Sequence, residues 1–258
     1  MHDGPVDLLW TGGWDSSYRL LSLLLDLRLP VQPIYLYDDK RVSAPVEVQT
    51  MQRLRERLAE EHPHTRELML PTRIDRVPAT RPRDDIEQAF DAAMRTYRIG
   101  DQYAFLSRWC RDQGLHDVEL SIEWFTHGTS TVLRPFVSPV RSRHGFDTFR
   151  LRADAPEQFR LLFGAFTFPL FVTSKPQMRE LAVANGWSSV LDETWFCHRP
   201  TRDLRPCGFC NPCQYALEQG FGARIPRSRR ALSRLYHATL MPLRGRARQI
   251  LRRFGRRA

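Results

Sequence analysis

The sequence predicts an α/β fold built on a doubly wound parallel sheet, with a four-cysteine zinc knuckle and a basic helical C-terminal tail. Three observations lead to this prediction. A glycine turn joins the apolar run Val6–Trp10 to a Leu-rich segment, strand-like and helix-like patterns then alternate, and four cysteines gather within residues 197–213. Such alternation is typical of a parallel sheet with helices on both faces, in which ligands bind beyond the carboxyl ends of the strands.

Hydrophobic periodicity assigns the elements in order. The expected strands are Val6–Trp10, Val31–Tyr37, Arg66–Leu70 and Asp117–Ile122. The expected helices are Ser16–Leu27, Val46–Glu61, Asp84–Tyr97, Asp101–Gln113 and Lys175–Asn185. Ser174 with Gln177 three residues later is a helix-start signal, so we expect Ser174 to cap the last helix. From Glu123 to about Arg152 we expect an irregular, Arg-rich stretch.

Length and charge suggest the domain organisation. A chain of 258 residues with 42% hydrophobic content suits one α/β domain, expected over 1–222, with a tail over 223–258. Residues 224–258 hold twelve arginines and no Asp or Glu, so the tail carries the whole net charge of +10. No apolar run is long enough to span a membrane, and the N-terminus lacks the features of a signal peptide. These features predict a cytoplasmic protein, and a homodimer stays open.

The tail is patterned for two amphipathic helices with arginine-rich outer faces. The first has Leu232, Leu235, Tyr236 and Leu240 at helical spacing, and we expect this stripe to pack on the core. The second follows Pro242 and has Leu243, Ala247, Ile250, Leu251 and Phe254 at helical spacing. Phosphates of a nucleic acid, an anionic membrane surface and an acidic protein are open alternatives as partners of the arginines.

The segment from Thr11 to Ser17 reads as a phosphate-binding turn. Gly12 and Gly13 let the backbone approach an anion, and the first N–H groups of the following helix point towards it. Thr11, Ser16 and Ser17 add hydroxyl donors. Asp15 would repel bare phosphate, so its presence predicts a Mg²⁺ ion between carboxylate and phosphates. The alternative is a purely structural turn capped by Asp15 or Ser16.

The cysteines predict a metal site. Cys197, Cys207, Cys210 and Cys213 can surround one Zn²⁺ ion, and four sulfur ligands leave no open position, which predicts a structural site. Disulfide pairing is the alternative, and a reducing compartment disfavours it. The fifth cysteine, Cys110, lies in an apolar-patterned segment and is expected to be a small buried hydrophobe.

Together, the turn and the cysteines resemble the 7-cyano-7-deazaguanine synthase family of the PP-loop ATP pyrophosphatases. The family loop Ser-Gly-Gly-x-Asp-Ser is matched by residues 11–16, with Thr in place of the first Ser. Thr173-Ser174-Lys175 and Thr194-Trp195-Phe196-Cys197 look like two further family segments, the second of which delivers the first zinc ligand. The resemblance implies an adenine nucleotide alpha hydrolase-like fold.

The resemblance also implies a reaction. ATP, Mg²⁺ and Zn²⁺ are the implied cofactors, with Asp15, Ser16 and Lys175 as catalytic residues. A carboxylate, 7-carboxy-7-deazaguanine or a related acceptor, would attack the α-phosphate of ATP and release pyrophosphate. Ammonia or another amine would then give an amide, a nitrile or a conjugate, as in queuosine biosynthesis. The implied ATP-binding residues are Trp10, Thr11, Gly12, Gly13, Asp15, Ser16, Ser17 and Tyr37.

The substrate half departs from the family. Where the family has Gly-Arg-Asn, this chain has Gly100-Asp101-Gln102, and a family segment after the next strand is replaced by Glu123-Trp124 and the residues that follow. The candidates for substrate recognition are Arg98, Asp101, Gln102 and Trp124, with Tyr97 and His127 as further neighbours. The acceptor therefore stays open, and a macromolecule is one alternative. Sulfur transfer to tRNA through Cys110 and a non-catalytic nucleic-acid-binding module are competing functions.

Overall fold

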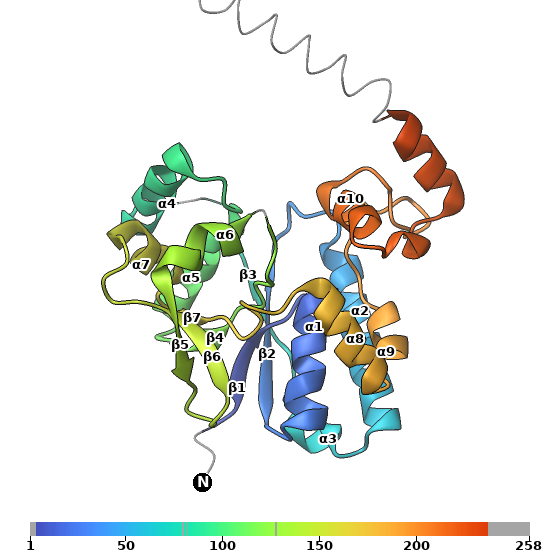
Figure 1. Cartoon of the computed structure of the whole chain (residues 1–258), viewed down its shortest axis with the longest axis horizontal. Helices are drawn as coiled ribbons and strands as arrows, with labels where there is room; N and C mark the ends of the chain where they lie inside the picture. Colours follow the sequence, from blue (N-terminus) through green and yellow to red (C-terminus); the bar gives the residue numbers. More distant parts are fainter. Residues whose placement is uncertain (1–3, 79, 81, 127, 237–258) are drawn as a thin grey trace, which may run out of the picture. The chain divides into compact units, whose positions relative to one another are not determined.

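The predicted alternation produces a mixed α/β architecture. The computed structural model describes residues 4–78, 80, 82–126 and 128–236, and its seven strands form one sheet in the order β3-β2-β1-β4-β7-β6-β5 (Figure 1). The chain forms two compact units, Met1–Trp195 and Phe196–Ala258, and the sheet belongs to the first. The strands are β1 Val6–Leu9, β2 Val31–Tyr37, β3 Arg73–Arg76, β4 Val118–Glu119, β5 Val137–Arg141, β6 Asp147–Leu151 and β7 Phe166–Thr167.

The sheet is mostly parallel. β1 pairs with β2 and β4, β2 pairs with β3, and β4 pairs with β7, all in parallel. The hairpin β5–β6 joins antiparallel to β7 through Arg150 opposite Thr167. The parallel part confirms the predicted sheet, and the antiparallel edge adds a feature that the sequence did not predict.

Helices cover both faces of the sheet. Figure 1 shows α1, α2, α8 and α9 on one face and α4, α5 and α7 on the other. The helices are α1 Trp14–Leu21, α2 Ala44–Glu61, α3 Thr65–Leu68, α4 Asp85–Thr96, α5 Gln102–Asp112, α6 Thr129–Leu133, α7 Glu157–Phe163, α8 Lys175–Ala184, α9 Ser188–Asp192 and α10 Asn211–Glu218. The described residues also form one π-helix, Ser22–Asp26, and two short 3₁₀ helices, Arg134–Phe136 and Gly222–Arg224.

An aromatic core lies between the sheet and the face of α4, α5 and α7. Phe159, Phe163, Phe166 and Phe168 are all fully buried there. Because α7 packs against α4 and α5, these rings anchor the three helices to the strands. None of the helices among the described residues combines the length and the apolar content needed to cross a membrane.

Two predicted segments are wrong. Residues 66–70 form no strand, because Thr65–Leu68 makes one helical turn and the edge strand lies later, at Arg73–Arg76. This edge strand pairs on one side only and has a single apolar residue, Ile74, so it carries no apolar run. The stretch expected to be irregular holds α6 and the hairpin β5–β6 instead.

The second unit contains α10 and a helix over residues 227–236. Leu232 and Leu235 are 50% and 60% exposed, and their expected packing on the core stays a prediction. The buried side of the helix carries Ser233 and the ring of Tyr236, which contacts Phe209 at 5.6 Å. The second tail helix lies outside the described residues, and the predicted domain limits stay a prediction.

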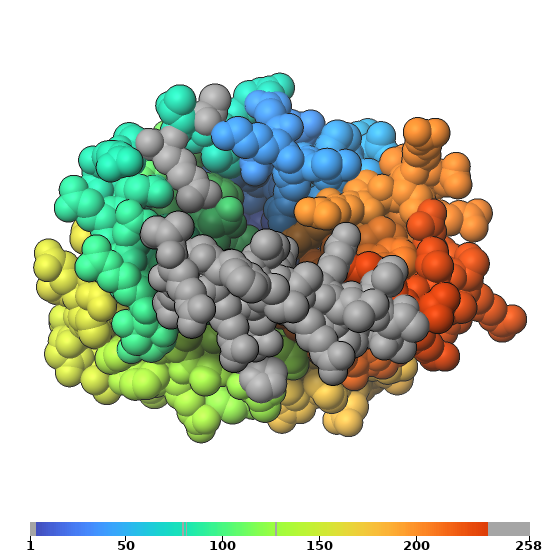
Figure 2. Space-filling model, turned by 90° about the horizontal axis from the view of Figure 1, so that it is seen from above, coloured from blue at the N-terminus to red at the C-terminus, as the bar shows by residue number. Residues whose placement is uncertain are grey.

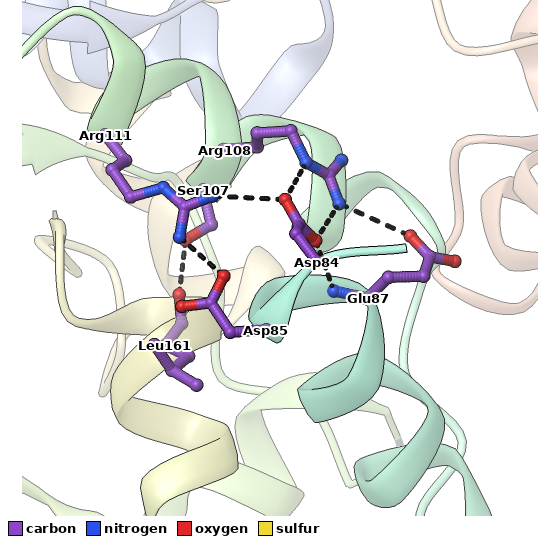
Figure 3. Close-up of polar contacts among 7 residues, drawn as sticks. All are labelled: Asp84, Asp85, Glu87, Ser107, Arg108, Arg111 and Leu161. Carbon is purple, nitrogen blue, oxygen red and sulfur yellow. Dashed lines mark hydrogen bonds and ion pairs between the residues drawn. The ribbon is translucent and has the colours of Figure 1, made fainter. Parts of the chain in front are cut away.

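An ion-pair cluster fixes α4 against α5 (Figure 3). Asp84 caps α4 by accepting from the backbone N–H of Glu87 at 2.9 Å. Arg108 of α5 donates to both oxygens of Asp84, at 2.7 and 2.8 Å, and Arg111 donates to it at 3.1 Å. The hydrogen bond from Arg108 is the largest cause of a pKa of Asp84 well below its ordinary value.

We predict that Asp84→Ala lowers the free energy of unfolding by about 1–2 kcal/mol, because the helix loses its cap and Arg108 loses its bidentate partner. A depressed carboxyl pKa stabilises the fold above the unfolded-state pKa of about 3.9 and ceases to do so as the pH falls through the folded-state value. The difference from wild type, measured by denaturant titration, should therefore shrink below about pH 4. Asp85→Ala is the control, because Asp85 is exposed and the only ion pair it makes among the described residues is with Arg111. An equal loss in both variants would contradict the role of Asp84.

Candidate functional site

The glycine turn follows the carboxyl end of β1 and leads into α1. Gly12 has φ +66°, a conformation that favours glycine. A Cβ at Gly12 would lie 3.2 Å from Met51 Cγ and 3.3 Å from the carbonyl oxygen of Glu47, so the backbone of α2 also excludes a side chain. The helix then begins at Trp14, with Gly13 as its N-cap residue. Glycine is therefore required at position 12 for two reasons, the positive φ angle and the close packing against α2.

Three hydrogen bonds hold the turn and its surroundings. The backbone N–H of Trp195 donates to the carbonyl of Gly12 at 2.9 Å. The indole N–H of Trp10 donates to Ser17 Oγ at 2.9 Å, and both side chains are buried. Ser16 Oγ donates to the Gly13 carbonyl at 3.4 Å. Trp10 and Ser17, predicted to bind the nucleotide, thus lie in the packing beneath the turn, whereas Thr11 is exposed on it.

A half-buried lysine lies beside the turn. The Nζ atom of Lys175 is 3.1 Å from Asp15 Oδ1 and 3.2 Å from Glu123 Oε1. The exposed fractions of these side chains are 15% for Lys175, 29% for Asp15 and 16% for Glu123. Three segments distant in the sequence therefore place one cation and two anions together.

Electrostatics keep this lysine protonated. Burial lowers the pKa of Lys175, but the carboxylates of Asp15 and Glu123 outweigh burial and hold it above its ordinary value. The ammonium group is thus a permanent positive charge beside the N-terminus of α1 at neutral pH. An anion that enters here meets both this charge and the first N–H groups of the helix.

The local sequence explains the position of Lys175. Ser174 caps α8 in a capping box with Gln177, which confirms the predicted helix start. The backbone N–H of Trp124 donates to the carbonyl of Thr173 at 3.0 Å, and Trp124 forms a parallel bridge with Ser174. These bonds place Glu123 and Lys175 next to each other. Glu123 was not among the predicted site residues, and its only signal is a polar side chain soon after a buried strand.

Tyr37 ends β2 next to the turn. The guanidinium of Arg76 lies 5.2 Å from the centre of the Tyr37 ring, and Arg76 forms an ion pair with Asp39.

Figure 2 views the molecule from the side on which β1 and β2 end. The surface is hollowed between the blue segments that follow these strands and the teal and green segments of residues 82–126. The hollow lies where a parallel α/β sheet is expected to bind a ligand.

The predicted substrate residues are only partly brought together. Arg98 and Asp101 are exposed in the segment between α4 and α5, and Gln102 begins α5. Tyr103, the next residue of α5, is buried in the core. Trp124 lies elsewhere, under the guanidinium of Arg134 at 4.4 Å from its ring centre. Among the described residues, Arg98 and Trp124 form no hydrogen bond or ion pair with each other, and His127 lies outside this part of the chain.

The cysteine cluster belongs to the second unit. The sulfurs of Cys197, Cys207, Cys210 and Cys213 all lie within 4.8 Å of one another. Three of the S–S separations are 3.4 Å for Cys210–Cys213, 3.8 Å for Cys197–Cys210 and 3.9 Å for Cys207–Cys213. A tetrahedral zinc site with Zn–S bonds of about 2.3 Å requires S–S separations of about 3.8 Å. The four sulfurs therefore fit a metal ion such as zinc.

Backbone N–H groups support the sulfurs. Cys207 N–H donates to Cys197 Sγ at 3.2 Å, Gly208 N–H to Cys213 Sγ at 3.4 Å and Phe209 N–H to Cys207 Sγ at 3.3 Å. Such bonds orient the ligands and stabilise thiolates. Gly208 has φ +83°, and a Cβ there would lie 3.0 Å from the carbonyl of Arg229, so this position needs glycine.

Cys110, the remaining cysteine, is in a different environment. It is fully buried in α5, as predicted. Burial, with a smaller contribution from Asp7, raises the pKa of its thiol to about 12. A thiol of this kind is not a nucleophile at neutral pH.

Comparison with known proteins gives no family. No protein-family model matches the chain, and no curated protein sequence matches it.

We predict that the purified protein contains one zinc ion per chain and that Cys210→Ser removes most of it, because three sulfurs bind zinc more weakly than four. Metal content is measured by inductively coupled plasma mass spectrometry. Cys110→Ala is the matched control and should keep its zinc. Equal zinc in the two variants would show that the cluster is not the metal site.

Proposed function

We propose that this protein is an ATP-dependent ligase that activates a carboxylate as its adenylate and transfers it to an amine. The observation that carries this proposal is the ammonium of Lys175, held by Asp15 and Glu123 beside a glycine turn and a helix N-terminus. A cation, the backbone N–H groups at a helix N-terminus and carboxylates suited to Mg²⁺ are the groups that a nucleoside triphosphate requires. The resemblance to 7-cyano-7-deazaguanine synthases agrees with this arrangement and supports the adenine nucleotide alpha hydrolase-like fold.

In the proposed reaction, an oxygen of the acceptor carboxylate attacks the α-phosphorus of ATP, and the bond to the bridging oxygen breaks. The negative charge that develops on the leaving pyrophosphate is stabilised by the N–H groups of Gly13 and the first turn of α1, and by Lys175. Asp15 and Glu123 offer oxygen ligands to Mg²⁺, which would neutralise phosphate charge when bound. The amine nitrogen then attacks the acyl carbon, AMP leaves, and the amine loses a proton.

The acceptor is proposed as a small carboxylate with a flat ring, 7-carboxy-7-deazaguanine or a relative. Trp124 is half-buried, follows Glu123 directly and offers a surface on which such a ring can stack. Arg134 over the same ring can pair with a carboxylate. The rest of the substrate pocket is proposed to include Arg98, Asp101 and Gln102. The Arg-rich residues 224–258 are the candidates for binding a macromolecular partner.

Sulfur transfer is disfavoured. That reaction needs a reactive cysteine outside the metal cluster, and Cys110 is fully buried with a raised pKa. No described feature favours it over ligation.

We predict that Lys175→Met and Asp15→Asn each reduce pyrophosphate release from ATP by at least about a hundredfold, because each removes a charge that acts on the leaving group. Release is measured with Mg²⁺, ammonia and 7-carboxy-7-deazaguanine, and the product by its mass. Arg179→Met is the control: it removes one positive charge from the exposed side of the same helix and should keep wild-type activity. Wild-type rates in Lys175→Met would contradict the proposal.

A further inference from the structure

A second cavity lies away from the glycine turn. Its volume is about 340 Å³, and its walls come from the start of β1, the start of β4, β7 and the β5–β6 hairpin. Val6 and Asp7 belong to the start of β1, whereas the glycine turn follows the other end of this strand. A cavity of this volume lies within the usual range for small-molecule sites, which begins at about 300 Å³.

Two of the three arginines that line the cavity have acidic partners. Arg141 donates to Asp147 at 2.8 Å, at the turn end of the hairpin. Arg150 forms an ion pair with Asp117, which directly precedes β4. The charge of each guanidinium is therefore largely matched by its own carboxylate.

Arg143 is different. Its Nη2 donates to the backbone carbonyl of Pro5 at 2.9 Å, and its Nε donates to His144 Nε2 at 3.2 Å. Within the described part of the chain, no carboxylate lies within ion-pair distance of Arg143. These two neutral acceptors fix the guanidinium in place and leave its positive charge unmatched.

Two of the three acidic residues in the wall, Asp117 and Glu119, are already paired with other arginines. Glu119 is buried and accepts from Arg19 at 2.6 and 2.7 Å, so its charge is already paired. Burial raises the pKa of Asp7. The positive charge of Arg143 is the largest of the charges that lower it, so Arg143 acts electrostatically on this part of the wall. Among the arginines that line the cavity, Arg143 is therefore the one with no ion pair within the described residues, and its guanidinium is the one available to a ligand.

Hydroxyl groups supply further donors. Thr148 and Thr167 line the cavity and are only 2% and 6% exposed. Among the described residues, Thr148 Oγ1 has no hydrogen-bond partner. A buried hydroxyl without a partner is costly, and a ligand acceptor would satisfy it after a rotation about χ1.

We propose that this cavity binds a small oxyanion, a carboxylate or a phosphate, through the guanidinium of Arg143. A guanidinium is always charged and binds both oxygens of such a group with parallel hydrogen bonds. The site is distinct from the proposed ATP site and does not depend on it.

The test uses the full-length protein without nucleotide, labelled with ¹⁵N. Inorganic phosphate and acetate are titrated in separate experiments, and the backbone amide signals of Thr148 and Thr167 are followed, which separates this cavity from the glycine turn. At least one probe should shift these signals in a saturable way, and the tighter probe identifies the oxyanion class.

Arg143→Gln should weaken that binding at least about tenfold, since it removes the bidentate charged donor. Arg152→Gln is the control, because Arg152 pairs with Asp154 and lies outside the cavity. Val140→Trp should also weaken binding by filling the cavity without a change of charge. The proposal is overturned if neither probe saturates these signals, if Arg143→Gln and Arg152→Gln weaken binding equally, or if Val140→Trp binds like wild type.

Discussion

A buried ion pair between α1 and β4 sets the geometry on which the candidate site depends. Arg19 Nε and Nη2 donate to the two oxygens of Glu119 at 2.7 and 2.6 Å, and both side chains are buried. Because two parallel bonds fix both distance and angle, α1 cannot slide or rotate against β4 without breaking them. A single buried charge left behind would be strongly destabilising, so the pair acts as one unit. Asp15 lies about one helical turn before Arg19, and Glu123 lies four residues after Glu119.

The same constraint explains why a lysine is needed where α8 begins. With α1 and β4 fixed, the carboxylates of Asp15 and Glu123 lie close together and would repel each other. Lys175 Nζ lies 3.1 to 3.2 Å from both and relieves this repulsion. The capping box of α8 and the bridge between Trp124 and Ser174 hold it there. Three interactions therefore hold the site residues in place: the ion pair of Arg19 with Glu119, the capping box of α8 and the bridge between Trp124 and Ser174.

The sequence predicted what depends on neighbouring residues. The glycine turn, the cap at Ser174, most helices and the four clustered cysteines are local patterns with a direct physical meaning. It did not predict what depends on distant partners. β3 is a charged edge strand, the β5–β6 hairpin has mixed polarity, and Glu123 becomes a site residue only because Lys175 reaches it from 52 residues away in the sequence.

The proposed reaction has to be reconciled with a lysine that is already engaged. An ammonium group has three N–H donors, and Asp15 and Glu123 together accept from it in this structure. Lys175 can turn towards a phosphate only if the negative charge of these carboxylates is balanced in another way. A divalent cation brought in with the nucleotide is the chemistry that suits them, since carboxylate oxygens are its preferred ligands. The dependence on Mg²⁺ that the resemblance implies then follows from the charges around Lys175, because without such a cation the lysine is held by the protein and not by the substrate.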